Sequence, residues 1–514
     1  MKYAYNNFYE LISFHAKKRK NKVALLVDDR KITYRELLQS VDKLATFLED
    51  KGVKEDDKVA LFLRNSAEFI YSIFAVSKIG AILVPINTFL KEDELTYILE
   101  DSGSSVLITS AIHEKVVNNS KASSLCEFIV WEGKEEVEGE KHLHFDDALS
   151  VELAKEHRTR RLEDTAVIIY TSGTTGKPKG AMLSNKNVLS NVHSGQKTVN
   201  VKAKDRAIVF LPMFHSLTFS IGVMLPLYVG GSIVIIKSIQ PFSNIFKQVF
   251  TKRVTLFFGI PDVYNALAKA KLPWYFMWFN CIRVFISGAA ALQPKTLDAM
   301  AKKFKRATLL EGYGLSEASP AVCMNTFKKQ KAGSVGTALY GYEMNVVDVD
   351  MNELPRGGIG DIIVKGDNVM QGYLGRPEAT EEAIINGWLL TGDMGYMDDE
   401  GFLFIVDRKK DLIISKGINV YPREIEEVID AYEGISASAV IGIVDEKSGE
   451  MPIVYIELSD GVEKLDETGL KKYMKEHLAN YKIPKQVYVI DELPKNATGK
   501  VLKRVLKEKI QEDA

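Results

Sequence analysis

Residues 170–180 read YTSGTTGKPKG and directly follow the apolar run 166–169. Glycines let a loop turn several backbone N–H groups toward one anion, while hydroxyl and ammonium groups add further donors. A plain turn requires neither four hydroxyls nor two lysines. We therefore predict a strand that ends in a phosphate-binding loop, which consists of Thr171, Ser172, Gly173, Thr174, Thr175, Gly176, Lys177 and Lys179.

This loop is not the P-loop of nucleoside triphosphatases. A P-loop has four residues between its glycines and a serine or threonine after its lysine. Here two residues separate Gly173 from Gly176, and Pro178 follows Lys177. The chain also has no GxGxxG, HExxH or GxSxG motif, which argues against dinucleotide-binding and hydrolase folds.

The pattern around the loop indicates an α/β fold. Short apolar runs, such as 59–63, 81–85, 232–237 and 284–287, are separated by helix-length segments. This alternation is typical of βα units and predicts doubly wound sheets. The sequence is therefore expected to begin with a large α/β domain.

Two changes of pattern divide the rest of the chain. Between about residues 333 and 406, short strands are separated by Gly, Pro, Asn and Asp, which predicts a small barrel-like β unit. After the charged residues 407–410, mixed helix and strand patterns return. We expect an N-terminal domain of residues 1–407 that includes the β unit, and a small, mobile α+β domain of residues 408–514.

Composition narrows the class of protein. A chain of 514 residues usually needs more than one hydrophobic core, and 46% hydrophobic with 26% charged residues is ordinary for a globular protein. The formal charge of -1 gives no global field toward nucleic acid. Three cysteines without a CxxC pair, and no signal-peptide pattern at the start, predict a cytoplasmic location. The uncharged stretch 207–236 is long enough to span a membrane, but its prolines and glycines favour buried short elements.

Further motifs occur in a fixed order along the chain: LPMFHS at 211–216, SGAA at 287–290, EGYGLSE at 311–317, WLLTGD at 388–393, DRKKDL at 407–412 and PKNATGK at 494–500. With the glycine-rich loop, this ordered set resembles the adenylate-forming enzymes, which include acyl-CoA synthetases, aryl-CoA ligases, luciferases and adenylation domains. The resemblance covers the chain from about residue 30 to its end. It implies a Mg²⁺- and ATP-dependent carboxylic acid:CoA ligase, which forms acyl-AMP and pyrophosphate and then acyl-CoA and AMP.

The resemblance also assigns the nucleotide site. It places the ring of Tyr313 against adenine, and the residues that line or flank this base pocket are Gly288, Ala289, Glu311, Gly312 and Gly314. Asp393 is implied as the acceptor for the ribose hydroxyls, with Arg408 beside it. Glu317 is similar to the family's magnesium ligand, with Thr174 as a hydroxyl partner near the metal.

Three lysines carry the implied catalytic steps. Lys500 is expected to contact the acid carboxylate and the α-phosphate as the acyl-adenylate forms, because a cation there stabilises two anions that repel each other. Lys410 matches the pivot about which the family's small domain turns. Residues 415–420, which include Lys416, match the segment that then faces the thiol channel.

The acid is less closely specified than the nucleotide. Positions that line the family's acyl pocket fall near 215–221, 289–292 and 318–322, and they are mostly apolar and small. An unbranched fatty acid of medium or long chain fits best, with an aromatic acid as the alternative. His215 is interpreted either as a gate beside the carboxylate or as a packed core histidine.

Partners beyond the small molecules stay open. The run LPWYFMWF at 272–279 fits an acyl tunnel, a peripheral membrane contact or burial in the core. A homodimer, an acyl-carrier-protein ligase and a non-catalytic binding module are further alternatives. The last would be indicated by loss of Lys500, Asp393 or Glu317, and all three are present.

Overall fold

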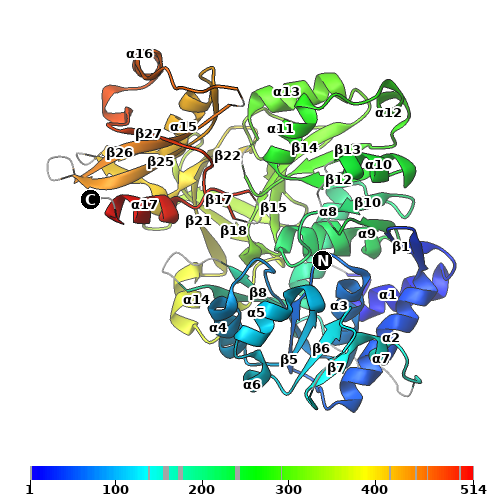
Figure 1. Cartoon of the computed structure of the whole chain (residues 1–514). Helices are drawn as coiled ribbons and strands as arrows, with labels where there is room; N and C mark the ends of the chain where they lie inside the picture. The colour runs from blue at the N-terminus through cyan, green and yellow to red at the C-terminus, as the bar shows by residue number, and fades with distance from the viewer. Residues whose placement is uncertain are drawn as a thin grey trace. The chain divides into compact units, whose positions relative to one another are not determined.

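The computed structural model describes residues 3–136, 139–153, 161–171, 177–237, 243–290, 292–415, 418–445, 449–459, 461–496 and 499–512. Its helices and strands are mixed along the chain, which confirms the expected α/β class (Figure 1). Contacts divide the chain into an N-terminal unit, Met1–Met344 with Val364–Leu389, and a C-terminal unit, Asn345–Ile363 with Leu390–Ala514. The domain boundary between residues 407 and 408 stays a prediction.

An eight-stranded sheet of the N-terminal unit carries the glycine-rich loop. Its order is β19-β9-β8-β4-β3-β5-β6-β7, and the strands are β3 Lys58–Phe62, β4 Ile82–Pro85, β5 Ser104–Ser110, β6 Phe128–Glu132, β7 His142–His144, β8 Thr165–Thr171, β9 Lys179–Ser184 and β19 Gly372–Tyr373. The strands β4, β3, β5, β6 and β7 are parallel, while β8 and β9 form an antiparallel hairpin. The predicted loop therefore connects two strands, whereas a P-loop leads from a strand into a helix.

A nine-stranded sheet forms the second layer of the N-terminal unit. Its order is β16-β15-β14-β13-β12-β10-β11-β1-β2, and the strands are β1 Val23–Val27, β2 Arg30–Thr33, β10 Arg206–Val209, β11 Ser232–Ile235, β12 Leu256–Gly259, β13 Val284–Ser287, β14 Thr308–Gly314, β15 Ala321–Met324 and β16 Thr337–Ala338. The strands from β1 through β11, β10, β12 and β13 to β14 are parallel. Ligands of parallel sheets bind at the carboxyl ends of the strands, so the segments that follow β10, β13 and β14 are candidate site residues.

The helices of the N-terminal unit differ in how deeply they are buried. They are α1 Phe8–Lys18, α2 Tyr34–Asp50, α3 Ala67–Ile79, α4 Glu92–Ser102, α5 Glu114–Asn119, α6 Ala122–Leu125, α7 Phe145–Ala148, α8 Asn185–Val199, α9 Leu225–Tyr228, α10 Ser243–Thr251, α11 Pro261–Lys269, α12 Trp274–Phe279, α13 Pro294–Lys303 and α14 Pro377–Ala383. Every residue of α3 except Glu68 is buried, as expected of a helix inside the fold. The uncharged stretch 207–236 divides into β10, a π-helix over Thr218–Met224, α9 and β11. No helix in the described part of the chain is long and apolar enough to cross a bilayer.

A third sheet has the order β17-β18-β21-β20, with β22 paired to β21. Its strands are β17 Glu343–Val347, β18 Gly360–Lys365, β20 Ile384–Ile385, β21 Trp388–Met397 and β22 Leu403–Arg408. These are short strands of the region expected to form a barrel-like unit. Two other short strands from that region, β16 and β19, pair instead with the edges of the two large sheets.

The last hundred residues form an α+β sandwich within the C-terminal unit. Its sheet has the order β24-β23-β26-β25 with β27 on β26, and the elements are β23 Ile413–Ser415, β24 Ile418–Val420, α15 Pro422–Asp430, β25 Ile435–Asp445, β26 Gly449–Leu458, α16 Glu467–His477, β27 Val487–Ile490 and α17 Lys503–Glu512. Alternate residues of β25 face opposite sides, since Val440 packs with Ile425 of α15 while Ile441 packs with Leu506 of α17. The expected mixed pattern is confirmed here.

Candidate active site

The glycine-rich loop is held at its two ends by the β8–β9 hairpin. Thr171 and Lys179 are partners in the strand register, and Ser172, Gly173, Thr174, Thr175 and Gly176 between them lie outside the described residues. The ammonium of Lys177 lies 5.0 Å from the ring centre of Tyr97, and that of Lys179 lies 5.2 Å from the ring centre of Tyr373. Both predicted cations are thus placed over aromatic faces at the C-terminal end of the loop.

Glu317 lies beside the end of β8. It belongs to the short 3-10 helix η3, Ser316–Ala318, which follows β14. Its Oε1 accepts a hydrogen bond from the Tyr373 hydroxyl at 3.0 Å and another from the Thr171 hydroxyl at 3.4 Å. Burial and the Glu317 charge raise the pKa of Tyr373, so the phenol remains a donor. Three elements that are far apart in sequence therefore position one carboxylate.

The donors around Glu317 fit a magnesium ion that also binds phosphate. The carboxylate and the Thr171 hydroxyl are hard oxygen donors, which Mg²⁺ prefers. Among the residues that the structure describes, no group of three or more His, Cys, Asp or Glu could hold a metal alone. Since protein-bound Mg²⁺ commonly uses one or two carboxylates together with substrate phosphates, a single carboxylate beside the loop is a suitable donor set.

The predicted base-pocket residues lie on β14 or directly after the neighbouring strand β13. Ser287 at the end of β13 pairs with Glu311 of β14, and Gly312 and Gly314 follow on the same strand. A side chain at Gly314 would place its Cβ 2.0 Å from the Pro320 carbonyl oxygen, so only glycine fits there. Ala289 has a φ of 71°, a left-handed conformation that is uncommon for alanine. The two segments named by the resemblance are therefore adjacent in space.

Within this pair of strands Glu311 has a structural partner. Its Oε1 accepts a hydrogen bond from the backbone N–H of Leu292 at 3.0 Å. The carboxylate thereby holds the turn that follows β13, the turn that includes Gly288 and Ala289. Tyr313 is partly exposed on β14.

The segment after β10 contacts the neighbourhood of Glu317 at one point and lines an apolar cavity at another. The Ser216 hydroxyl lies 2.9 Å from the Ser316 hydroxyl, next to Glu317. The Nδ1 atom of His215 accepts a hydrogen bond from the Leu217 N–H at 3.3 Å, and burial lowers the pKa of His215 to about 4. His215 is therefore neutral near pH 7. Leu217 lies next to Gly288, because a Cβ added at Gly288 would lie 3.5 Å from the Leu217 Cδ2 atom.

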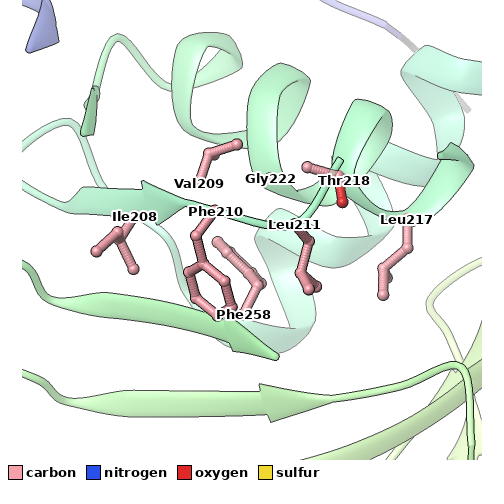
Figure 2. A pocket seen from close by; sticks show the side chains of 8 residues that line it. All are labelled: Ile208, Val209, Phe210, Leu211, Leu217, Thr218, Gly222 and Phe258. Carbon is pink, nitrogen blue, oxygen red and sulfur yellow. The ribbon is translucent and has the colours of Figure 1, made fainter. Parts of the chain in front are cut away.

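Beyond Leu217 lies a small apolar cavity of about 10 Å³. Figure 2 shows that the strand β10 and the residues after it form one side, and the π-helix forms another. Its lining residues are Ile208, Val209, Phe210, Leu211, Leu217, Thr218, Gly222 and Phe258, and none is charged. The volume is about that of one water, so a bound acyl chain requires these side chains to move apart. π-helical turns are frequent at functional sites, and this one borders the cavity.

The C-terminal unit contains the remaining predicted residues. Asp393 of β21 pairs in register with Arg408 of β22, and the Arg408 Nε atom lies 3.5 Å from the Asp393 Oδ1 atom. Lys500 lies in a tight loop, where its N–H donates to the Asn496 side chain and its carbonyl accepts from the Asn496 N–H, both at 2.9 Å. Lys416 lies outside the described residues.

Lys500 belongs to the same charged cluster as Asp393 and Arg408. Burial lowers its pKa to about 7, and the neighbouring Arg408 and Lys410 act in the same direction. Asp393 and Asp411 oppose that shift. The structure thus brings together three residues that are separated by up to 107 positions in the sequence, while their catalytic roles stay predictions.

Sequence reasoning missed Tyr373, Ser216 and Ser316 as parts of the site. Tyr373 reaches Glu317 because the two-residue strand β19 pairs with β9. A two-residue strand has no periodicity that a sequence pattern could reveal. The two serines lie inside the recognised motifs, and only the structure gives their contact.

A family model described as AMP-binding enzyme matches residues 12–374, which include the loop, Glu317 and the two β-strands of the predicted base pocket. The chain belongs to the AMP-binding enzyme family. A second model, AMP-binding enzyme C-terminal domain, matches residues 424–500, up to and including Lys500. The match of both models confirms the family predicted from the ordered motifs.

Similar proteins narrow the family further. A feruloyl-CoA synthase of Amycolatopsis sp is 34% identical over 475 residues, 92% of each chain. A long-chain-fatty-acid–CoA ligase of Bacillus subtilis is 34% identical over 523 residues, 96% of this chain and 92% of the relative. This AMP-binding enzyme is therefore an adenylate-forming ligase of the acyl- and aryl-CoA type, a group that uses ATP, CoA and Mg²⁺.

Solved structures of similar enzymes have the same fold as this chain. The anthranilate CoA ligase AuaEII in complex with anthranoyl-AMP has a TM-score of 0.90 at 27% identity, covering 99% of this chain and 98% of that one. ATP-bound MatB from Rhodopseudomonas palustris has a TM-score of 0.89 at 31% identity, covering 98% and 99%. These neighbours confirm the fold of the AMP-binding enzyme, with its large N-terminal and small C-terminal parts.

Proposed function

We propose that this enzyme is a fatty acid:CoA ligase that acts on medium- or long-chain acids. The observation that carries the proposal is the apolar, uncharged region that begins at Leu217 and continues into the cavity behind it. An aliphatic tail gains free energy from leaving water for such a region, whereas a second carboxylate or an amine on the acid would lose its hydration there. His215 is neutral and supplies no charge to hold a polar substituent.

The first half-reaction joins the acid to AMP. A carboxylate oxygen attacks the α-phosphorus of ATP, the bond to the bridging oxygen breaks, and pyrophosphate leaves with its electron pair. The ammonium of Lys500 is the group we assign to the developing charge between carboxylate and α-phosphate. In this assignment Asp393 accepts the ribose hydroxyls, Arg408 lies beside it, and the ring of Tyr313 stacks on adenine.

Glu317 and the loop hydroxyls Thr171 and Thr174 are the residues we assign to magnesium and the phosphates. When bound, Mg²⁺ neutralises charge on the departing pyrophosphate. The hydrogen bonds from Tyr373 and Thr171 support this role of Glu317, because they orient the carboxylate before any substrate binds. Lys177 and Lys179 add positive charge where the loop leads into β9.

The second half-reaction transfers the acyl group to CoA. The thiolate of CoA attacks the acyl carbon, the bond from that carbon to the phosphate oxygen breaks, and AMP leaves with the oxygen. We assign Lys410 to the pivot that lets the C-terminal domain, residues 408–514, serve both steps, and Lys416 to the segment that faces the thiol. Three free cysteines, two of them buried, support a cytoplasmic location for this thiol chemistry.

An aryl acid:CoA ligase is the second candidate. The feruloyl-CoA synthase relative is as similar as the fatty acid ligase relative, at 34% identity. A flat ring also prefers apolar walls.

A panel of acids separates these candidates. Pyrophosphate release is measured with octanoate, decanoate, palmitate, benzoate, cinnamate and ferulate, with and without CoA. Higher kcat/KM for the aliphatic acids is the expected result, with acyl-CoA formed only when CoA is added. Equal or higher kcat/KM for cinnamate or ferulate would reject the fatty acid assignment. Transfer of the acyl group to a carrier protein but not to CoA would reject the assignment of CoA as the acceptor.

A further inference from the structure

Helix α12, Trp274–Phe279, carries an exposed cluster of aromatic side chains. The exposed fractions are 71% for Trp274, 70% for Trp278, 65% for Phe279 and 47% for Tyr275. Single exposed apolar side chains are common on proteins, but four on one six-residue helix form a contiguous surface. We call these four residues the aromatic patch. Of the aromatic residues on this helix only Phe276 is buried, so burial in the core explains one position of the run.

The patch is held in place by contacts from neighbouring elements. The Phe276 ring lies 5.8 Å from Phe246 and 6.1 Å from Phe250 of α10, measured between ring centres. The guanidinium of Arg306 donates to the carbonyl oxygens of Met277 and Trp278. A helix this short has little stability alone, so these contacts fix the direction in which the outer rings point.

Positive charge is concentrated in the stretch of sequence that includes the patch, and Arg306 contacts α12 directly. Figure 1 shows α12 near the helices α10, α11 and α13 of the same unit. Residues 243–306, which include all four helices, hold eleven Lys or Arg and only two Asp or Glu, in a chain of net charge -1. Two of these cations pair with acids from outside the segment, Arg283 with Asp205 and Lys252 with Asp29. The exposed cations nearest in sequence to α12 and at the end of α13 are Lys269, Lys271, Lys302, Lys305 and Arg306.

We propose that the aromatic patch and these cations dock on the surface of an anionic lipid bilayer. Tryptophan and tyrosine side chains are favoured at the boundary between headgroups and acyl chains, and lysine and arginine are attracted to anionic headgroups. The exposed rings and the exposed cations of the neighbouring segments match both requirements, while the excess of cations opposes close approach of a second copy of this chain.

The patch also continues inward toward the proposed acyl region. Phe276 belongs to the same apolar core as Phe210 and Leu211, which line the cavity behind Leu217. Docking there would place the enzyme where long-chain fatty acids dissolve. This benefit rests on the proposed function, but the docking itself does not, so it is tested without acid, ATP or CoA.

The test is sedimentation with vesicles of equal parts phosphatidylcholine and phosphatidylglycerol, compared with vesicles of phosphatidylcholine alone. The wild-type protein is expected to bind the anionic vesicles, and less so at high salt. The variant W274S/W278S/F279S is expected to lose at least about tenfold in partition coefficient, as follows from removing three interfacial aromatic side chains. The control F327S changes an exposed aromatic residue on another loop and is expected to bind as wild type.

Tryptophan fluorescence gives an independent signal. The chain has four tryptophans, and Trp131 is buried while Trp274 and Trp278 are exposed. Anionic vesicles should shift the wild-type emission to shorter wavelength and leave the emission of the triple variant unchanged. Thermal unfolding of the variants verifies that the exposed substitutions leave the fold intact.

Two results would overturn the proposal. One is equal vesicle binding by wild type and triple variant, including no binding by either. The other is a wild-type dimer that the triple variant dissociates, because the patch would then be covered by a second copy. Failure of the fatty acid assignment would appear only in the acid panel and would leave the vesicle result standing.

Discussion

His215 in the N-terminal unit and Lys500 in the C-terminal unit are both basic side chains whose pKa is lowered by burial, but their surroundings differ. For His215, burial is the only cause, and the pKa falls to about 4. For Lys500, two carboxylates partly offset burial and two neighbouring cations, and the pKa stays at about 7. The first region is thus suited to an uncharged tail, and the second contains a cation whose charge responds to nearby anions. We therefore assign the tail of the acid to the first region and the reacting carboxylate to Lys500.

The largest expected effect comes from removing the cation. Lys500→Ala should lower the rate of adenylation by about a hundredfold or more, because a transition-state charge donor is lost. Added acyl-adenylate should still be converted to acyl-CoA at a rate near that of wild type. The rate of adenylation is followed by pyrophosphate release, and the rate of thioester formation by consumption of acyl-adenylate. Equal losses in both rates would contradict the assignment of Lys500 to adenylation alone.

Glu317→Gln tests the carboxylate that lies near the loop. Adenylation should fall about thirtyfold at fixed Mg²⁺, a size typical of damage to a metal site. Tyr373→Phe is the matched control, since it keeps the carboxylate and removes one orienting hydrogen bond. It should raise the Mg²⁺ concentration for half-maximal rate only a few-fold. Unchanged Mg²⁺ dependence in both variants would place the metal elsewhere.

Lys410→Pro tests the pivot. Proline fixes the backbone φ angle and should restrict rotation there, so transfer to CoA should slow about tenfold while adenylation changes little. This pattern is the reverse of that expected for Lys500→Ala. A variant that loses both activities in parallel would favour one fixed arrangement of the active site.

The smallest effect is the pH dependence. Lys500 carries its charge below its pKa of about 7, so kcat/KM for adenylation should fall roughly fivefold between pH 7 and pH 8. Lys500→Arg should remove this decline because arginine does not titrate in that range. His215→Gln should keep the wild-type profile, since His215 is neutral throughout. A decline that disappears in His215→Gln and persists in Lys500→Arg would reverse the assignment of the two groups.

The parts of this site that sequence could predict are those with a local signal. The strand β8 follows from an apolar run, and the ordered motifs identified the family. The loop that the glycines, hydroxyls and lysines predict after β8 lies largely outside the described residues. The contact of Tyr373 with Glu317 depends on the nonlocal pairing of β19 with β9, which no local pattern encodes. The sequence also does not show which residues of the aromatic run 274–279 are buried. Six residues are too few for periodicity to separate the buried Phe276 from its exposed neighbours.

We propose that the enzyme activates a fatty acid through an acyl-adenylate. Decanoate labelled with ¹⁸O in both carboxylate oxygens tests it directly, with the AMP product analysed by mass spectrometry. We expect pyrophosphate as the other product of ATP and one ¹⁸O atom transferred to AMP in each turnover, because the carboxylate oxygen that attacks phosphorus stays there when the thioester forms. Label found in inorganic phosphate together with ADP, or AMP that carries no label, would contradict it.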